Sequence, residues 1–189
     1  MLTTIFFSCK GPQQPEMKTE VLFNVNQSLL GDTVSDDALG IVYQPPLHWK
    51  PVDSAYFGQV RELFATQKTF ISDYIVRDYY QDDSTNAIMI VTDLSRVSDS
   101  ALNLMLEQMR EMPEGGNKKF EVQIGEYGYH GFDVFQILLQ NPAFINFKLI
   151  FLKGANKRFQ MDYMIPTRVY AGEVRTIESS IGSVNKINN

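Results

Sequence analysis

The sequence predicts an α+β fold, in which an antiparallel β-sheet of about six to seven strands is sandwiched by about three helices. Several segments in the carboxyl half alternate between apolar and polar residues, which is the pattern of half-buried strands. The connections between them are short and contain glycine, proline or asparagine, as in an antiparallel meander. Three other segments carry apolar residues at helical spacing. With 189 residues, 44% of them hydrophobic, the chain can form one well-packed domain.

The amino half of this domain begins with a short predicted strand at 40–43, followed by a proline-rich stretch. A helix is expected over about 53–67, because Asp53-Ser54 can cap it and apolar residues follow at helical spacing. Two segments rich in Ile, Val and Tyr predict strands over 71–80 and 86–92. A second helix is expected from Ser98 to the residue before Pro113, with an apolar stripe formed by Leu102, Met105, Leu106, Met109 and Met112.

The carboxyl half predicts four strands and a terminal helix. Three strands alternate with period two, at 120–124, 145–151 and 159–165. The segment 132–140 is apolar on both faces and is therefore expected to be a central strand. After Pro166, a helix is predicted from the spacing of Val174, Ile177, Ile181 and Val184, which would lay its apolar stripe across the sheet.

The amino terminus predicts a membrane anchor. Cys9, the only cysteine, follows an apolar run at 2–8 that ends in a small residue, which resembles the lipobox of bacterial lipoproteins. We therefore expect 1–8 to be a residual lipoprotein signal, 9–20 a flexible tether and 21–189 a single folded domain. Nothing basic precedes Leu2, so the signal would begin upstream. The alternative is a short apolar arm with one buried thiol.

This reading predicts a location in the bacterial cell envelope, where acylated Cys9 would hold the protein in membrane lipid, facing the periplasm or the cell exterior. No later segment has the roughly 20 apolar residues that span a bilayer. A net charge of −5 argues against nucleic acid as a partner, because binding to phosphates needs clustered Lys and Arg.

Three stretches together resemble the PsbP-like fold. They are Gly40-Ile41-Val42-Tyr43 with the following Pro45 to Trp49, then Tyr163-Met164-Ile165-Pro166, and then Ile177 to Val184. The resemblance covers roughly 38–187, and the superfamily includes an extrinsic photosystem II subunit, a eukaryotic Ran-binding import factor and bacterial lipoproteins. The resemblance implies a non-enzymatic binding module, and no functional residue can be carried over from it.

The segment 125–131 is the most suggestive surface loop, because its glycines permit sharp turns while Tyr127, Tyr129 and His130 would project outward. Together with Tyr43 and Trp49, these three residues form our predicted partner contact. The alternative is a hairpin connection whose tyrosines fold back onto the sheet.

Metal and catalytic sites are not indicated. His48 and His130 lack the spacing of a zinc centre, and neither Asp36-Asp37 nor Asp82-Asp83 has the register of a calcium loop. Ser179 and Ser180 lack a nucleophile elbow. We therefore predict no cofactor and no catalytic residue.

Two functional hypotheses follow. The first is a lipid-anchored envelope protein that acts as a non-enzymatic protein-binding or complex-stabilising module, with an envelope protein as its partner. The alternative is a small-ligand receptor or hydrolase with a site near 125–131, which would need His130, Glu126 and a further carboxylate or serine within hydrogen-bonding reach.

Overall fold

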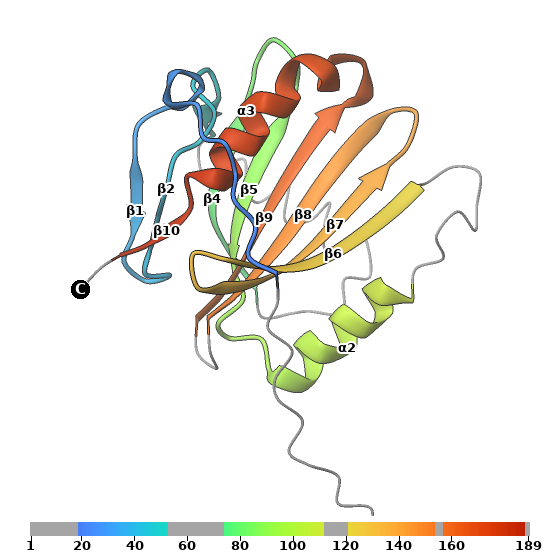
Figure 1. Cartoon of the computed structure of the whole chain (residues 1–189). Coiled ribbons are helices and arrows are strands. Elements are labelled where there is room, and N and C mark those ends of the chain that lie inside the picture. The colour runs from blue at the N-terminus through green and yellow to red at the C-terminus, as the bar shows by residue number, and fades with distance from the viewer. Residues whose placement is uncertain (1–18, 53–73, 112–120, 154–156, 188–189) are drawn as a thin grey trace, which may run out of the picture.

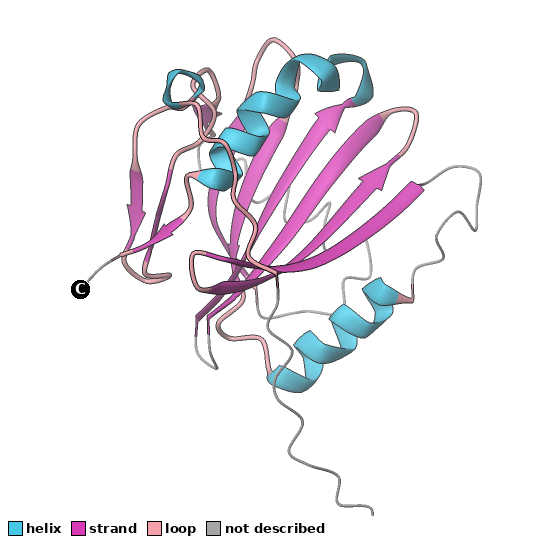
Figure 2. Cartoon of the chain, viewed as in Figure 1, coloured by secondary structure: helices cyan, strands magenta, loops and turns pink. Residues whose placement is uncertain are grey.

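A computed structural model of the chain describes residues 19–52, 74–111, 121–153 and 157–187. They form two antiparallel sheets, one of seven strands and one of three, with two α-helices (Figures 1 and 2). The large sheet has the strand order β3-β4-β5-β9-β8-β7-β6 and the small sheet the order β1-β2-β10. The α+β class and the seven-stranded antiparallel sheet are therefore as the sequence predicts.

The elements have the following bounds. The large sheet contains β3 (Lys50–Pro51), β4 (Ile75–Gln81), β5 (Ile88–Asp93), β6 (Glu121–Tyr129), β7 (Phe132–Gln140), β8 (Phe144–Lys153) and β9 (Lys157–Pro166). The small sheet contains β1 (Val34–Asp36), β2 (Ile41–Tyr43) and β10 (Asn185–Lys186). The helices are α2 (Asp99–Arg110) and α3 (Tyr170–Gly182), and the short 3₁₀ turns are η1 (Gln27–Leu29) and η2 (Thr167–Val169).

The larger core lies between α3, the small sheet and one face of the large sheet. Alternate residues of β8 and β9 point into it, because successive side chains of a strand lie on opposite faces. Ile177 and Ile181 of α3 pack there, at the helical spacing that the sequence predicts. The hydroxyl of Tyr163 lies 3.0 Å from that of Ser180, so a hydrogen bond joins the sheet to the helix.

The opposite face of the sheet is covered in part by α2. Leu102 and Leu106 of this helix pack with Phe135, Ile137 and Ile150, and each buried leucine contributes about 2 kcal/mol of transfer free energy. The helix begins after Ser98, whose hydroxyl accepts a hydrogen bond from the Ala101 amide at 3.2 Å. Neither described helix has the length and apolar character that crossing a membrane would require.

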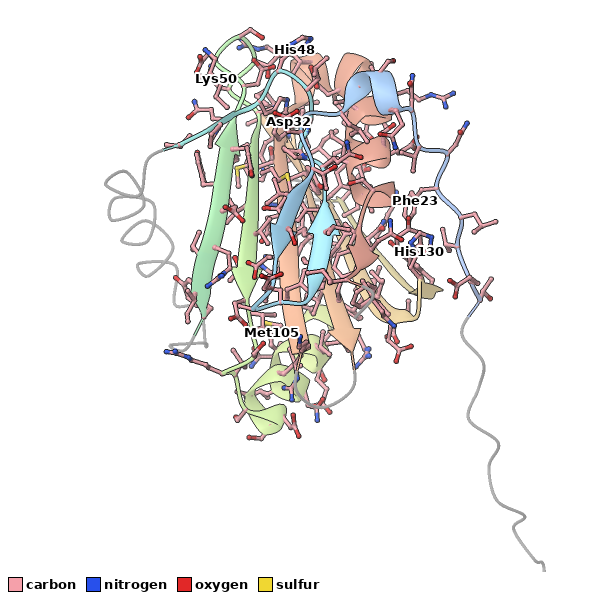
Figure 3. The ribbon with its side chains drawn as sticks, turned by 90° about the vertical axis from the view of Figure 1, so that its left-hand side faces the viewer. Phe23, Asp32, His48, Lys50, Met105 and His130 are labelled. Atoms are coloured by element: carbon pink, nitrogen blue, oxygen red, sulfur yellow. The ribbon has the colours of Figure 1, made fainter. Side chains whose placement is uncertain are left out.

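Residues 19–25, which we call the N-terminal strap, run from the β6–β7 hairpin toward the carboxyl end of α3 (Figure 1). Side chains alternate along the strap: Val21, Phe23 and Val25 are half-buried, and Glu20, Leu22 and Asn24 are exposed. The Phe23 ring meets the Tyr129 ring edge-on, with centroids 5.1 Å apart. Figure 3 shows Phe23 and His130 on the same side of the molecule.

The strap pairs with β6 at Gly128. The Gly128 amide donates to the Thr19 carbonyl, and the Gly128 carbonyl accepts from the Val21 amide, both at 2.9 Å. A Cβ at Gly128 would lie 2.5 Å from a carboxylate oxygen of Glu20. That oxygen is the end of a flexible side chain, and the nearest backbone atom of the strap, Cα of Glu20, would lie 3.9 Å from this Cβ, so a small side chain here would displace only the Glu20 carboxylate.

Two expectations about this region are wrong. Most of 125–131 is not a loop, since β6 continues to Tyr129 and the turn consists of His130 and Gly131, with φ values of 47° and 73°. The strand at 132–140 is also not central, because β7 lies next to the edge strand β6 and β9 occupies the middle of the sheet. β7 is apolar on both faces because it contributes to both cores.

The helix predicted at 53–67 lies outside the described residues. The small sheet is absent from the sequence prediction apart from β2, because strands of two or three residues are too short to show an alternating pattern.

Candidate functional site

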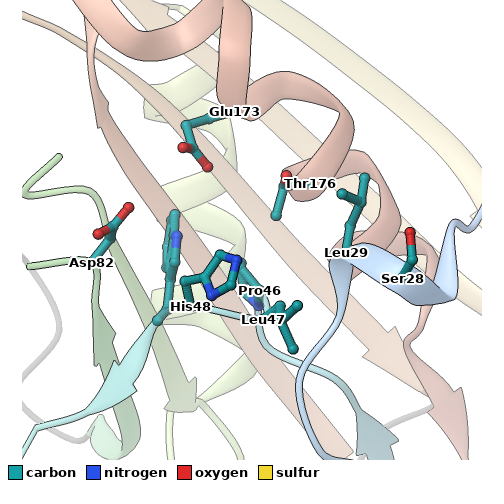
Figure 4. Close-up of a pocket in the computed structure, with 9 residues that line it drawn as sticks. Ser28, Leu29, Pro46, Leu47, His48, Asp82, Glu173 and Thr176 are labelled. Atoms are coloured by element: carbon teal, nitrogen blue, oxygen red, sulfur yellow. The ribbon is translucent and has the colours of Figure 1, made fainter. Parts of the chain in front are cut away.

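A small hollow opens where four segments that are distant in the sequence meet (Figure 4). Its volume is about 90 Å³. We call it the His48 hollow, and it is lined by Ser28, Leu29, Pro46, Leu47, His48, Trp49, Asp82, Glu173 and Thr176. One wall therefore comes from η1, another from the proline-rich corner before β3 and a third from the first turns of α3, and Asp82 is contributed by the turn between β4 and β5.

The proline-rich corner is held by backbone hydrogen bonds. The Leu47 amide donates to the Leu29 carbonyl at 2.9 Å, and the Trp49 amide donates to the Pro46 carbonyl at 3.1 Å. The Trp49 side chain is 5% exposed, and its ring centroid lies 6.3 Å from that of Tyr163 in the core. The corner consequently places His48 and Leu47, both exposed, at the rim of the hollow.

Asp82 begins the turn between β4 and β5 and is a satisfied carboxylate. Its Oδ1 accepts from the amide and the hydroxyl of Ser84, each at 2.7 Å, and its Oδ2 accepts from the Thr85 hydroxyl at 2.9 Å. Burial alone would raise the pKa of Asp82, but these hydrogen bonds outweigh it and hold the pKa below its usual value. The carboxylate is therefore charged at neutral pH.

Glu173 lies in the first turn of α3 and is half-buried. Burial raises the pKa of Glu173, and the negative charge of Asp82 raises it further, while His48 opposes the rise. In the part of the chain that the structure describes, neither the Glu173 side chain nor the His48 side chain makes a hydrogen bond or a salt bridge. The hollow thus presents an acid and an imidazole for which the described residues supply no hydrogen-bond partner.

These groups do not form a metal centre. Among the described residues, no three His, Cys, Asp or Glu side chains lie close enough together to hold one ion. The hollow is therefore suited to binding through hydrogen bonds, charge and apolar contact rather than through coordination.

Of the five predicted contact residues, four are buried: Tyr43, Trp49, Tyr127 and Tyr129. The prediction that Tyr127 and Tyr129 project outward is wrong, and the alternative, in which they fold back onto the sheet, describes the structure. Phe23 of the strap packs against both rings. Only His130 of the five is exposed.

Among the predicted contact residues, the three tyrosines each donate a hydrogen bond through the hydroxyl group. Tyr43 donates to Asp78 at 2.5 Å, Tyr127 to Gln136 at 2.8 Å and Tyr129 to the Gly182 carbonyl at 2.6 Å. Burial raises the pKa of all three, that of Tyr129 to about 12. The three hydroxyls therefore form hydrogen bonds within the protein, and the three aromatic rings are part of the core.

His130 does not join a catalytic cluster with Glu126. Its ring stacks on Tyr129 at 4.1 Å between centroids, and its Nδ1 lies 3.2 Å from the Val184 carbonyl. Glu126 points to the other face of the sheet and accepts from Arg110 of α2 at 2.7 Å. The arrangement that the hydrolase alternative needs near 125–131 is therefore not formed by the described residues.

The remaining candidates have structural roles or lie outside the described residues. Asp36 accepts from Arg77 at 2.9 Å, and Asp83 accepts from Lys50 at 2.6 Å. Ser179 and Ser180 donate to the carbonyls of Arg175 and Gln44. Cys9, the predicted lipid attachment site, lies outside the described residues.

Sequence reasoning did not identify Glu173, which is the most informative residue of the hollow. An acidic residue early in a helix is ordinarily attributed to the helix dipole. His48 and Trp49 were the only signal available in the sequence, since they combine an imidazole and an indole in a proline-rich corner.

No protein-family model matches the chain, and no curated protein matches it. Among solved structures, the chain is similar to cyanobacterial PsbP (CyanoP) from Synechocystis sp. PCC 6803, with a TM-score of 0.50 and 11% identity over 86% of this chain and 95% of that chain. It is also similar to the Ran-binding protein Mog1p of Saccharomyces cerevisiae, with a TM-score of 0.44 and 11% identity over 83% of this chain and 95% of that chain. The arrangement of strands and helices, together with the likeness to cyanobacterial PsbP, shows that the chain has the PsbP-like fold.

Proposed function

We propose that this protein is a non-enzymatic protein-binding module of the bacterial cell envelope, held at the membrane by acylated Cys9 and facing the periplasm or the cell exterior. The His48 hollow and its rim form the contact surface. One observation carries the proposal: half-buried Glu173, whose carboxyl group has no hydrogen-bond partner among residues 19–52, 74–111, 121–153 and 157–187, lies in one concavity with the exposed apolar residue Leu47. Small concavities of this kind accept single anchor side chains of a partner.

The size of the hollow favours a protein partner over a free metabolite. A volume of about 90 Å³ is well below the roughly 300–1,000 Å³ of pockets that enclose whole small molecules. A side chain needs less room, because the rest of its protein remains outside. The resemblance seen in the sequence also implies a binding module, although fold alone does not define a function.

Site-specific photocrosslinking tests the contact surface. Leu47 and Leu104 are similarly exposed, at 47% and 49%, but Leu47 borders the hollow and Leu104 lies on α2. With benzoyl-phenylalanine at position 47, we expect one discrete adduct in the native envelope, and with the same residue at position 104 we expect none. An adduct from position 104 alone, or none from either position, would contradict the proposed surface.

Membrane fractionation tests the anchor separately. With a complete lipoprotein signal upstream, we expect the wild-type protein in the membrane fraction, because two or more acyl chains give stable anchoring. Replacing Cys9 by Ala removes the acylated thiol and should release the protein into the soluble fraction. Membrane retention of Cys9→Ala would show that this cysteine is not the anchor.

A further inference from the structure

We propose that the His48 hollow binds an arginine side chain of the partner. This inference rests on the proposed function and adds the chemistry by which the partner is recognised.

The charge of the hollow favours a cation. Two carboxylates line it, Asp82 and Glu173, and they face each other closely enough for Asp82 to raise the pKa of Glu173. His48 is the only lining residue that can become positively charged. The nearby Lys50 is exposed and bonded to Asp83 at 2.6 Å. A bound cation would relieve the repulsion between the two acids, whereas an anion would increase it.

The spacing of the polar groups favours guanidinium over a metal ion. Asp82, Glu173 and His48 do not meet around one point, as coordination to a single ion would require. A guanidinium group is planar and carries five N–H donors, so it can reach acceptors that lie apart. Glu173 needs such a donor, because the described residues supply none.

The walls of the hollow also suit a flat, weakly hydrated cation. Trp49 and His48 contribute aromatic rings. Leu29, Pro46 and Leu47 contribute apolar surface (Figure 4). Guanidinium stacks on aromatic faces, and the arginine stem can lie along apolar side chains. An ammonium group is a more strongly hydrated point charge and would use these walls less well.

Trp49 allows a direct test, because it is the only tryptophan in the chain. Its indole N–H therefore gives a single NMR signal, and it comes from a residue that lines the hollow. The full-length chain is titrated into the millimolar range with Nα-acetyl-arginine-methylamide, and the shift of this signal is followed. The matched probes are the citrulline derivative, which has nearly the same shape but no charge, and the lysine derivative. We expect a saturable shift with the arginine probe, a weaker one with lysine and none with citrulline.

The matched variants are Glu173→Gln and Glu178→Gln, both on α3. Glu178 is exposed and does not line the hollow. Because charged hydrogen bonds are the strong ones, Glu173→Gln should weaken binding of the arginine probe about tenfold or more. Glu178→Gln should bind as the wild type does. An unchanged spectrum elsewhere confirms that each variant is folded.

Lowering the pH gives a second readout. Protonation of Glu173 removes its charge, and the two ionisable groups that face it are Asp82 and His48. The loss of the Glu173 charge should weaken binding of the arginine probe as the pH falls. In Glu173→Gln, the part of this pH dependence that belongs to Glu173 should disappear.

Three results would overturn the inference: no shift with the arginine probe, equal binding of the citrulline probe, or unchanged binding in Glu173→Gln. The proposed function is judged independently by crosslinking from position 47. If the partner is captured equally well by the wild type and by Glu173→Gln, the binding module stands and arginine recognition does not.

Discussion

Gly182, the last residue of α3, lies where the N-terminal strap crosses the helix. A Cβ at this position would be 2.6 Å from Cβ of Phe23 and 2.7 Å from Cγ2 of Val25. Gly172, near the beginning of the same helix, has nothing within 4 Å of the corresponding point. Packing against the strap therefore requires glycine at position 182 but not at position 172.

We predict opposite effects for alanine at these two positions. Gly182→Ala should lower the free energy of unfolding by about 1–3 kcal/mol, because the strap must move away from the helix. Gly172→Ala should raise it by about 0.5–1 kcal/mol, because alanine loses less backbone entropy in a helix. Urea denaturation measures both values. Equal effects of the two substitutions would show that the strap does not pack against Gly182.

The sequence was least informative about whether an individual aromatic side chain is buried or exposed. Tyr43, Trp49, Tyr127 and Tyr129 are amphipathic, so their presence in the chain is compatible with a surface or with a core. Their burial depends on partners far away in the sequence, such as the Gly182 carbonyl that accepts from Tyr129. The exposure of His130 at a hairpin turn is a local property and was predicted.

At the scale of elements, β7, β8 and β9 were predicted to within two residues at each end, because their apolar patterns are long enough to be recognised, whereas β6 was predicted only to 124 because its glycines were taken as turn residues. β7 has its predicted bounds, 132–140, and both α2 and α3 begin within a few residues of their predicted starts. Residues 19–20 of the strap were assigned to the tether. The strap forms a single β-bridge to β6, between Glu20 and Gly128, and one bridge produces no recognisable sequence pattern.

The strap should contribute measurably to stability. Replacing Phe23 by Ala removes a half-buried ring that packs on Tyr127 and Tyr129, and should cost about 2 kcal/mol in the free energy of unfolding. Exchange of the Gly128 amide should also become faster, since Thr19 accepts its hydrogen bond.

Leu22→Ala is the matched control for Phe23→Ala. Leu22 is the next residue in the strap but is 83% exposed, so its loss should change the free energy of unfolding by less than about 0.5 kcal/mol. A cost for Leu22→Ala as large as that for Phe23→Ala would indicate that the strap packs with its other face inward.

At the scale of the whole molecule, the buried tyrosines predict a loss of stability at high pH. Burial raises the pKa of Tyr43, Tyr127, Tyr129 and Tyr163 above the ordinary value of 10.0. The folded state favours the neutral phenol of these tyrosines. Their contribution to the free energy of unfolding is therefore complete below pH 10 and is lost as the pH rises toward the pKa that each tyrosine has in the folded state. Urea denaturation should show the free energy of unfolding falling between pH 10 and pH 12.

Tyr129→Phe provides the control for this pH dependence. Burial and the nearby Glu20 raise the pKa of Tyr129 to about 12. The variant should be less stable at neutral pH, because the buried Gly182 carbonyl loses its donor. Its stability should nevertheless fall less steeply between pH 10 and pH 12 than that of the wild type. An equal slope would mean that Tyr129 ionises as readily in the folded state as in the unfolded state.

The alternation of apolar residues in the carboxyl half determined the antiparallel sheet, and the helical spacing after Pro166 determined α3, because each pattern encodes locally which side of an element is buried. Tertiary structure alone decided the strand order, the burial of the predicted contact tyrosines and the existence of the His48 hollow. Leu29, His48 and Glu173 belong to distant segments, and they meet only because α3 and the proline-rich corner pack at the same edge of the sheet. Local periodicity carries no information about such a meeting point, so the site appears only when the chain is folded.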